Sequence, residues 1–158
     1  MLSYFPAIRF FHSILRYFIL LFAVIVVIQC IWGILGKKQF GKPNKLATLL
    51  LLISCDVQLL VGLALYFIGG WFHQLSSPGL MKNAYTRFYA VEHTAGMIVA
   101  LILVHIGYKI GKKSMDSDRK FKRVFWFIFI ALAIFFATIP GQGRQIVGRP
   151  NIPTLSQS

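Results

Sequence analysis

Acidic residues are scarce in this chain. Its 158 residues include 4 Asp and Glu against 17 Lys and Arg, which gives a formal net charge of +13. Charged residues of both signs make up only 13% of the chain, whereas hydrophobic residues make up 57% and the mean hydropathy is +0.69. A soluble domain of this length does not have such a composition. The sequence therefore predicts an integral membrane protein whose first partner is the lipid bilayer.

The basic residues lack the arrangement that nucleic-acid binding requires. They lie between apolar runs and form neither an amphipathic helix nor a continuous patch. Positive residues that flank apolar runs are typical of loops that set the orientation of a membrane protein. No nucleic-acid partner is expected.

Cysteine is also rare, with only Cys30 and Cys55, and both lie within apolar runs. The chain has no CxxC pair and no other cysteine spacing that binds metals. We therefore interpret the two thiols as small apolar packing groups and expect no disulfide between them. Internal repeats and low-complexity segments are absent as well.

Long apolar runs are what the chain has in abundance. Four of them approach the roughly 20 residues that a spanning helix needs, and they cover residues 10–35, 46–68, 88–108 and 124–139. The predicted fold is an all-α integral membrane four-helix bundle over residues 1–140, followed by a polar tail over residues 141–158. The first run is about twice as long as a signal-peptide core and lacks a small-residue cleavage site, so it should remain as an anchor. Asp116 or Ser117 is expected to cap the helix that leads into the fourth run.

The distribution of lysine and arginine predicts an orientation. The connection between the first two runs contains Lys37, Lys38, Lys42 and Lys45, and residues 109–123 contain seven further basic residues. The amino end, the second connection and the tail hold the other six. Because cytoplasmic loops are enriched in lysine and arginine, we expect the first and third connections in the cytoplasm and both termini on the outer, periplasmic side of a bacterial inner membrane.

Titratable side chains inside the apolar runs are the main functional signal. The third run carries Glu92, His93 and His105, and a charged side chain at the centre of a bilayer costs roughly 2.5 kcal/mol or more. Such residues therefore persist mainly where they face a partner, a cofactor or water. The outer half of the bundle gathers His93 and Glu92 with residues of the first run, namely Arg9, His12 and Arg16, in which each arginine lies one turn from His12.

Two histidines on different helices at one level suit a b-type haem. Neutral imidazole nitrogens would take the two axial positions of the iron, and the porphyrin would lie between the helices. We therefore predict His12 and His93 as metal ligands. Arg9, Arg16 or Arg144 could neutralise the haem propionates, and Gly96, beside His93, would let a flat macrocycle approach the backbone.

Alternatives remain open at this site. Helix rise places His12 several ångströms further out than His93, an offset that helix tilt or a later helix start could remove. Met97, one turn below His93, is a second candidate ligand. The two histidines could also be interfacial residues that bond to carbonyl groups, lipid head groups or Glu92.

Asp56 and His105 lie apart from this cluster. An isolated carboxylate near the middle of a span should be neutral, paired or part of a proton route. Its candidate partners are His93, His105 or a residue of another subunit. We favour a structural hydrogen bond over a proton relay, and we expect His105 to bond to a neighbouring helix near the cytoplasmic face.

The chain resembles a family of small four-span bacterial membrane proteins that carry the label cytochrome B. The resemblance covers most of the chain apart from the tail and is carried by the segments CDVQLLVGLALYF, LMKNAYTRFYAVEH, LILVHIGYKIGKK and DSDRKFKR, together with His12, Ser13, Arg16 and the Ile139–Pro140 pair. It implies functional roles for five residues, namely His12, Arg16, Gln58, Glu92 and His93. The chain departs from the family at Asp56, where the resemblance implies a histidine.

The preferred hypothesis is a membrane-embedded electron-transfer protein similar to b-type cytochromes. It would hold one haem b near the outer face and pass electrons between a quinol and a redox partner there, so a quinone is a second candidate ligand. The alternative is a haem-free accessory or assembly subunit that packs against other membrane subunits. A proton-conducting element that uses Asp56 is a third, less favoured class.

Overall fold

The computed structural model describes residues 4–140, and these residues form helices joined by short connections. Four segments are long and apolar enough to cross a membrane. They are α1 (Phe5–Leu35), α2 (Lys42–Ile68), the continuous segment Ala84–Lys112 and α6 (Ser117–Thr138). The third segment consists of α4 (Ala84–Arg87), the π-helix η1 (Phe88–Glu92) and α5 (His93–Lys112). The prediction of four apolar helices is thus confirmed, and each extends beyond the predicted run at one end or both. The tail over residues 141–158 lies outside the described residues.

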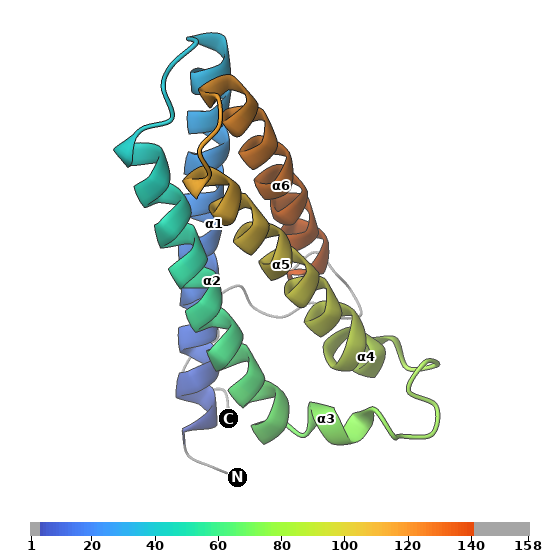
Figure 1. Ribbon diagram of the computed structural model, residues 1–158. Coiled ribbons are helices and arrows are strands. Elements are labelled where there is room, and N and C mark those ends of the chain that lie inside the picture. Colours follow the sequence, from blue (N-terminus) through green and yellow to red (C-terminus); the bar gives the residue numbers. More distant parts are fainter. Residues whose placement is uncertain (1–3, 141–158) are drawn as a thin grey trace.

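The long helices form a ring in which each packs against two neighbours. Helix α1 contacts α2 and α6, and α5 contacts the same two helices from the opposite side. Successive long helices run in opposite directions (Figure 1). The α1–α2 and α5–α6 connections therefore lie at one end, which we call the basic end because it carries Lys37, Lys38 and Lys113. The opposite end, which we call the cavity end, carries the short helix α3 (Trp71–Gln74) and α4.

The half of the bundle near the basic end is packed solidly. Its buried side chains include Val26, Leu51, Val104 and Ile128, each no more than 1% exposed. Glycines allow close approach here: a Cβ on Gly33 would lie only 2.4 Å from Cζ of Phe121. Small residues at helix contacts let backbones pack closely where no water is present to drive association.

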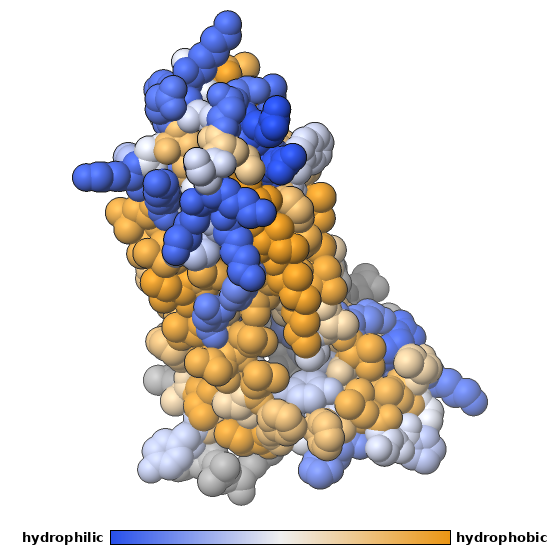
Figure 2. Space-filling view, viewed as in Figure 1, coloured by the Kyte–Doolittle hydropathy of each residue, from blue (hydrophilic) through white to orange (hydrophobic). Residues whose placement is uncertain are grey.

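Polar contacts join the two connections at the basic end. The Ser117 hydroxyl accepts a hydrogen bond from the Phe40 amide (3.1 Å) and donates one to Gln39 Oε1 (2.8 Å). Asp116 caps α6, because its carboxylate accepts hydrogen bonds from the amides of Asp118 and Arg119. Of the two predicted capping residues, Asp116 therefore has this role. Hydrophilic side chains gather at this end and give way to an apolar surface below it (Figure 2).

Helices α2 and α5 diverge toward the cavity end (Figure 1). The connection between them includes Gly70 and Gly79, whose positive φ angles of 74° and 85° suit residues without a side chain. A cavity lies inside the bundle at this end, and His12 of α1 and His93 of α5 line it.

Candidate functional site

A cavity of about 360 Å³ occupies the interior at the cavity end. This volume lies in the range of small-molecule and cofactor sites. Its wall combines apolar side chains with aromatic and basic ones from α1, α2, α3, the third spanning segment and α6. Its polar residues and its aromatic residues are Phe5, Arg9, His12, Ser13, Arg16, Gln58, Tyr66, Trp71, Tyr85, Tyr89, His93, Thr94 and Phe135. The space-filling view shows a hollow in the lower half of the molecule (Figure 2).

The imidazoles of His12 and His93 lie next to each other in the wall of this cavity. Their ring centroids are 6.4 Å apart and their planes meet at 70°. His12 comes from α1 and His93 from the start of α5. The predicted difference in depth does not keep the two rings apart, although α1 begins at Phe5, five residues before the predicted start of the first run.

A local change of helix type precedes His93. Residues Phe88–Glu92 form a π-helix, and the His93 amide donates to the Phe88 carbonyl five residues earlier. Single π-turns inside α-helices occur frequently at functional sites. The Tyr66 hydroxyl on α2 donates to the Ala90 carbonyl within this turn at 2.9 Å. The π-turn is therefore held from a neighbouring helix as well as by its own backbone.

The backbone of α6 orients the His93 ring. His93 Nδ1 lies 2.8 Å from the carbonyl oxygen of Thr138. A carbonyl oxygen only accepts hydrogen bonds, so Nδ1 carries a proton, and in the neutral ring Nε2 then has the lone pair. An Nδ1–H to carbonyl bond is the usual support for a histidine that binds a metal through Nε2.

His12 is held by Gln58 on α2. The Gln58 amide nitrogen donates to the His12 carbonyl oxygen at 3.0 Å and lies 3.3 Å from His12 Nε2. Two buried atoms of this pair, His12 Nδ1 and Gln58 Oε1, have no hydrogen-bond partner within residues 4–140. Buried polar atoms without partners are costly and few in native structures. They indicate a site in which a bound group completes the polar contacts.

Gly62 provides the space that the His12 ring occupies. A Cβ added to Gly62 would lie 3.2 Å from His12 Cε1 and 3.7 Å from His12 Nδ1. Gly62 follows Gln58 by one helical turn, so both face α1 at the level of His12. The absence of a side chain at Gly62 leaves room for the imidazole.

The two arginines predicted beside His12 both line the cavity. The Arg16 guanidinium donates to the Tyr17 hydroxyl at 3.3 Å and lies 5.0 Å from the centroid of the Tyr17 ring. The Arg9 carbonyl accepts a hydrogen bond from the Ser13 hydroxyl at 3.0 Å. No Asp or Glu is among the described residues that line the cavity, so its wall is suited to an anionic group. Arg144 lies outside the described residues.

Gly96 has a different role from the predicted one. It is not among the lining residues, and a Cβ at this position would lie 2.5 Å from Thr138 Cγ2. The absence of a side chain at Gly96 therefore allows α6 to pack closely against α5, and Gly96 does not face the space where a macrocycle would lie. Met97, one turn from His93, does line the cavity.

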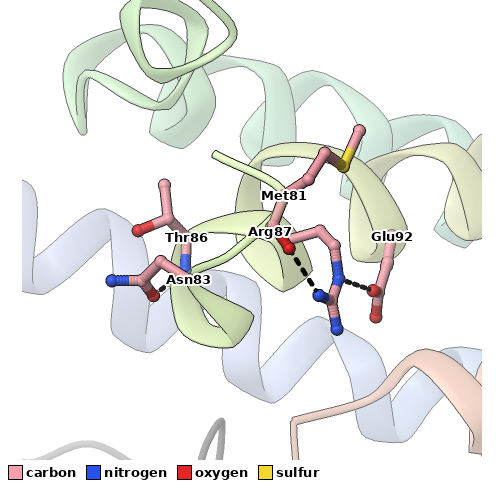
Figure 3. Close-up of polar contacts among 5 residues, drawn as sticks. All are labelled: Met81, Asn83, Thr86, Arg87 and Glu92. Atoms are coloured by element: carbon pink, nitrogen blue, oxygen red, sulfur yellow. Dashed lines mark hydrogen bonds and ion pairs between the residues drawn. The ribbon is translucent and has the colours of Figure 1, made fainter. Parts of the chain in front are cut away.

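Glu92 also lies away from the cavity wall. Its carboxylate accepts a hydrogen bond from Arg87 Nε at 2.6 Å, and Arg87 in turn donates to the Met81 carbonyl at 2.8 Å (Figure 3). Asn83 caps the adjoining α4 by accepting from the Thr86 amide at 3.0 Å. The two partners of the ion pair are five residues apart, which is the hydrogen-bond spacing of a π-helix. Glu92 thus supports the turn that positions His93.

Asp56 pairs with His105, one of the three candidate partners that the sequence analysis considered. Asp56 Oδ1 lies 3.4 Å from His105 Nε2, and His105 Nδ1 lies 3.0 Å from the Leu101 carbonyl. The expected contact of His105 with a neighbouring helix is therefore present, between α5 and α2. The pair lies outside the cavity lining, and both side chains are more than 40% exposed.

Sequence reasoning missed the aromatic part of the site. Trp71 and Tyr89 stack with centroids 5.2 Å apart, and Tyr85 lies 4.9 Å from Tyr89. These rings line the cavity beside His93, whose ring centroid is 6.4 Å from that of Tyr89. The available signal was the density of Trp and Tyr in the second connection and at the start of the third run.

The described residues contain no group of three or more His, Cys, Asp or Glu side chains that could hold a metal ion. A haem needs fewer protein ligands, because four of its iron ligands come from the porphyrin. His12 and His93, with ring centroids 6.4 Å apart in the cavity wall, are the two residues that would hold such a group.

The helices and the cavity define the class of this protein, a multi-pass helical membrane protein with a histidine- and arginine-lined internal site. Comparison with protein-family models, curated proteins and solved structures finds no match for the chain. The resemblance to the four-span cytochrome b-like family therefore stays a prediction.

Proposed function

We propose that this protein is a b-type-cytochrome-like electron-transfer protein that holds one haem b between His12 and His93. The observation that carries the proposal is the separation of 6.4 Å between two imidazoles from different helices, in the wall of a cavity of about 360 Å³. Haem, when bound, supplies one-electron transfer chemistry. The residues of the chain would bind and orient the haem and exclude water from it.

The protein would bind the group through opposite walls of the cavity. His93 is oriented by the Thr138 carbonyl, so that Nε2 is its metal-binding nitrogen. His12 has its buried Nδ1 without a partner within residues 4–140 and its ring confined between Gln58 and Gly62. Arg9 and Arg16 would attract the propionates, and the Trp71 and Tyr89 rings would exclude water from one edge.

The proposed setting is a bacterial inner membrane, with the basic end in the cytoplasm and the cavity end at the outer face. The support for this orientation is the excess of lysine and arginine in the first and third connections. The electron donor would be a quinol in the bilayer, and the acceptor would be a redox partner at the outer face. A cavity near the outer face would place the electron within reach of such a partner.

The absorption spectrum of the full-length protein, purified from cells supplied with haem precursor, tests the proposal. We expect a Soret band and a reduced-minus-oxidised alpha band at about one haem per chain. His93→Ala and His12→Ala should each abolish both bands or reduce the haem content by at least about tenfold. His73→Ala is the matched control, since His73 is exposed on α3 and outside the cavity wall.

Two results would contradict the proposal. One is a colourless protein that copurifies stoichiometrically with other membrane subunits, which would favour the accessory-subunit alternative. The other is a haem spectrum that His73→Ala lowers as much as His93→Ala does, because loss of haem would then follow from general loss of histidine.

A further inference from the structure

The Asp56–His105 pair lies on the outside of the bundle. It joins the middle of α2 to α5, with Asp56 Oδ1 at 3.4 Å from His105 Nε2. The side chains are 48% and 41% exposed, respectively. Within residues 4–140, Asp56 makes no other hydrogen bond or ion pair. Close to half of the surface of each side chain is therefore exposed on the outside of the bundle.

For helices that span a bilayer, the middle of α2 lies in the hydrocarbon region. Asp56 is 14 residues from the start of α2 and 12 from its end, roughly 20 Å from either end at 1.5 Å per residue. Lipid chains offer no hydrogen bonds, so titratable residues at membrane depth normally face protein or water. The exposed part of the pair is therefore a surface that needs a polar partner.

The side chains around the pair form an uncovered apolar stripe. On α2 the neighbours one turn away are Ile53 and Leu60, 49% and 67% exposed, and on α5 Ile102 is 52% exposed. On the other side of His105, one turn toward the basic end, the stripe ends at the exposed Lys109. The spacing of three and four residues places them on the same helix faces as Asp56 and His105. Hydrophilic side chains extend from the basic end into the otherwise apolar surface in Figure 2. The stripe thus has the composition of a helix–helix contact in a membrane, with one polar pair at its centre.

We propose that this face of α2 and α5 is the interface between two copies of the chain. The argument is charge complementarity of the face with itself. It presents one acidic and one basic group side by side, so a two-fold axis beside the pair brings Asp56 of each copy to His105 of the other. An isologous interface requires such self-complementarity. A partner of a single charge sign would match only one member of the pair. The proposal does not depend on what the cavity binds.

Mixing two variants distinguishes pairing between copies from pairing within one copy. A chain with Asp56→His carries two histidines at this face, and a chain with His105→Asp carries two carboxylates. Energy transfer between fluorescently labelled full-length chains in lipid vesicles reports association. We expect each variant alone to associate on the order of tenfold more weakly than the natural chain. An equimolar mixture of the two should recover association, because only the mixed dimer restores Asp–His pairs across the axis.

Cross-linking provides a second measurement in chains that keep Asp56 and His105. It therefore does not depend on whether the Asp56→His and His105→Asp variants fold. Single cysteines at Ile53, Leu60 or Ile102, in a chain without Cys30 and Cys55, should form covalent dimers with a short bis-maleimide. Cysteines at Trp126 and Phe129, equally exposed on α6, should not. A chain that stays monomeric at all protein-to-lipid ratios overturns the proposal. Equal cross-linking at the α6 positions also overturns it. So does a mixture of the two variants that associates no better than either variant alone, or a Leu60→Cys chain that cross-links only to a different protein.

Discussion

The orientation of the His12 imidazole depends on the absence of a side chain at Gly62. The ring lies against the backbone of α2, with Cε1 only 3.2 Å from the position of a Cβ on Gly62. Gln58, one turn earlier, bonds to the His12 carbonyl. Together these residues of α2 determine where the imidazole of α1 points.

Gly62→Ala should therefore weaken haem binding while leaving the helix intact. Alanine favours a helix interior by about 1 kcal/mol over glycine, so the free energy of unfolding should not fall much. Displacing the ring from its rotamer costs about 1 kcal/mol, which corresponds to about fivefold weaker binding. Titration of haem into the apo protein measures this. Ser54→Ala, on the same helix and outside the cavity wall, should leave the titration unchanged.

At this scale the sequence indicated the ligand candidates but not their supports. His12, His93, Arg9 and Arg16 were predictable because titratable residues in apolar runs are rare and informative. Gly62 was not, since a single glycine in an apolar helix has many possible reasons. Gly96 was assigned to a macrocycle although it packs against Thr138. Periodicity places a residue on a helix face but does not say which neighbour that face meets.

Among the elements, the π-helix Phe88–Glu92 has the most direct connection to the site. It inserts one extra residue into the turn that precedes His93, and the Tyr66 hydroxyl bonds to its Ala90 carbonyl. This turn could not be predicted from the sequence, because π-turns have no periodic pattern of their own. The Arg87–Glu92 contact at 2.6 Å, five residues apart, is intelligible only once the turn is known.

Tyr66→Phe tests how far the π-turn depends on α2. Removing the hydroxyl leaves the carbonyl of the buried residue Ala90 without this donor, which should lower the free energy of unfolding by about 1 kcal/mol. Denaturation in detergent followed by circular dichroism measures the change. Tyr4→Phe is the comparison, because Tyr4 is 72% exposed and its hydroxyl makes no hydrogen bond within residues 4–140. Equal effects of the two variants would show that the Tyr66 bond contributes nothing specific.

The start of α6 provides a prediction at the same scale. Asp116 accepts two backbone hydrogen bonds as N-cap, whereas Asp118 pairs with Lys122 on an exposed helix face. Asp116→Ala should cost about 1 kcal/mol of stability, and Asp118→Ala should cost no more than about 0.5 kcal/mol. Thermal unfolding of both variants compares them. A larger loss for Asp118→Ala would mean that the cap is not what holds this helix end.

At the scale of the whole molecule, the basic connections and the cavity lie at opposite ends of the bundle. Lysines and arginines gather at the basic end, and the His12–His93 cavity lies at the other. Four helices of alternating direction were predictable from four apolar runs and the connections between them. That the helices diverge and enclose a cavity was not, because side-chain packing across helices is not encoded in the hydrophobicity of any one run.

Thiol labelling in intact cells tests the orientation. Ser76→Cys and Ser114→Cys are matched changes at exposed positions in the second and third connections. In a chain without Cys30 and Cys55, a membrane-impermeant maleimide should label Cys at position 76 from outside and reach position 114 only after the membrane is permeabilised. The reverse pattern would place the basic end outside and contradict the proposed setting of the cavity.

The most direct test of the account is electron paramagnetic resonance of the oxidised full-length protein. Two imidazoles on one ferric haem produce a low-spin signal, and a haem with one imidazole produces a high-spin signal. We predict a low-spin signal that becomes high-spin, or disappears, when His12 is replaced by alanine. A low-spin signal that survives His12→Ala unchanged, or the absence of any haem signal in the natural protein, would contradict the claim that His12 and His93 hold the iron together.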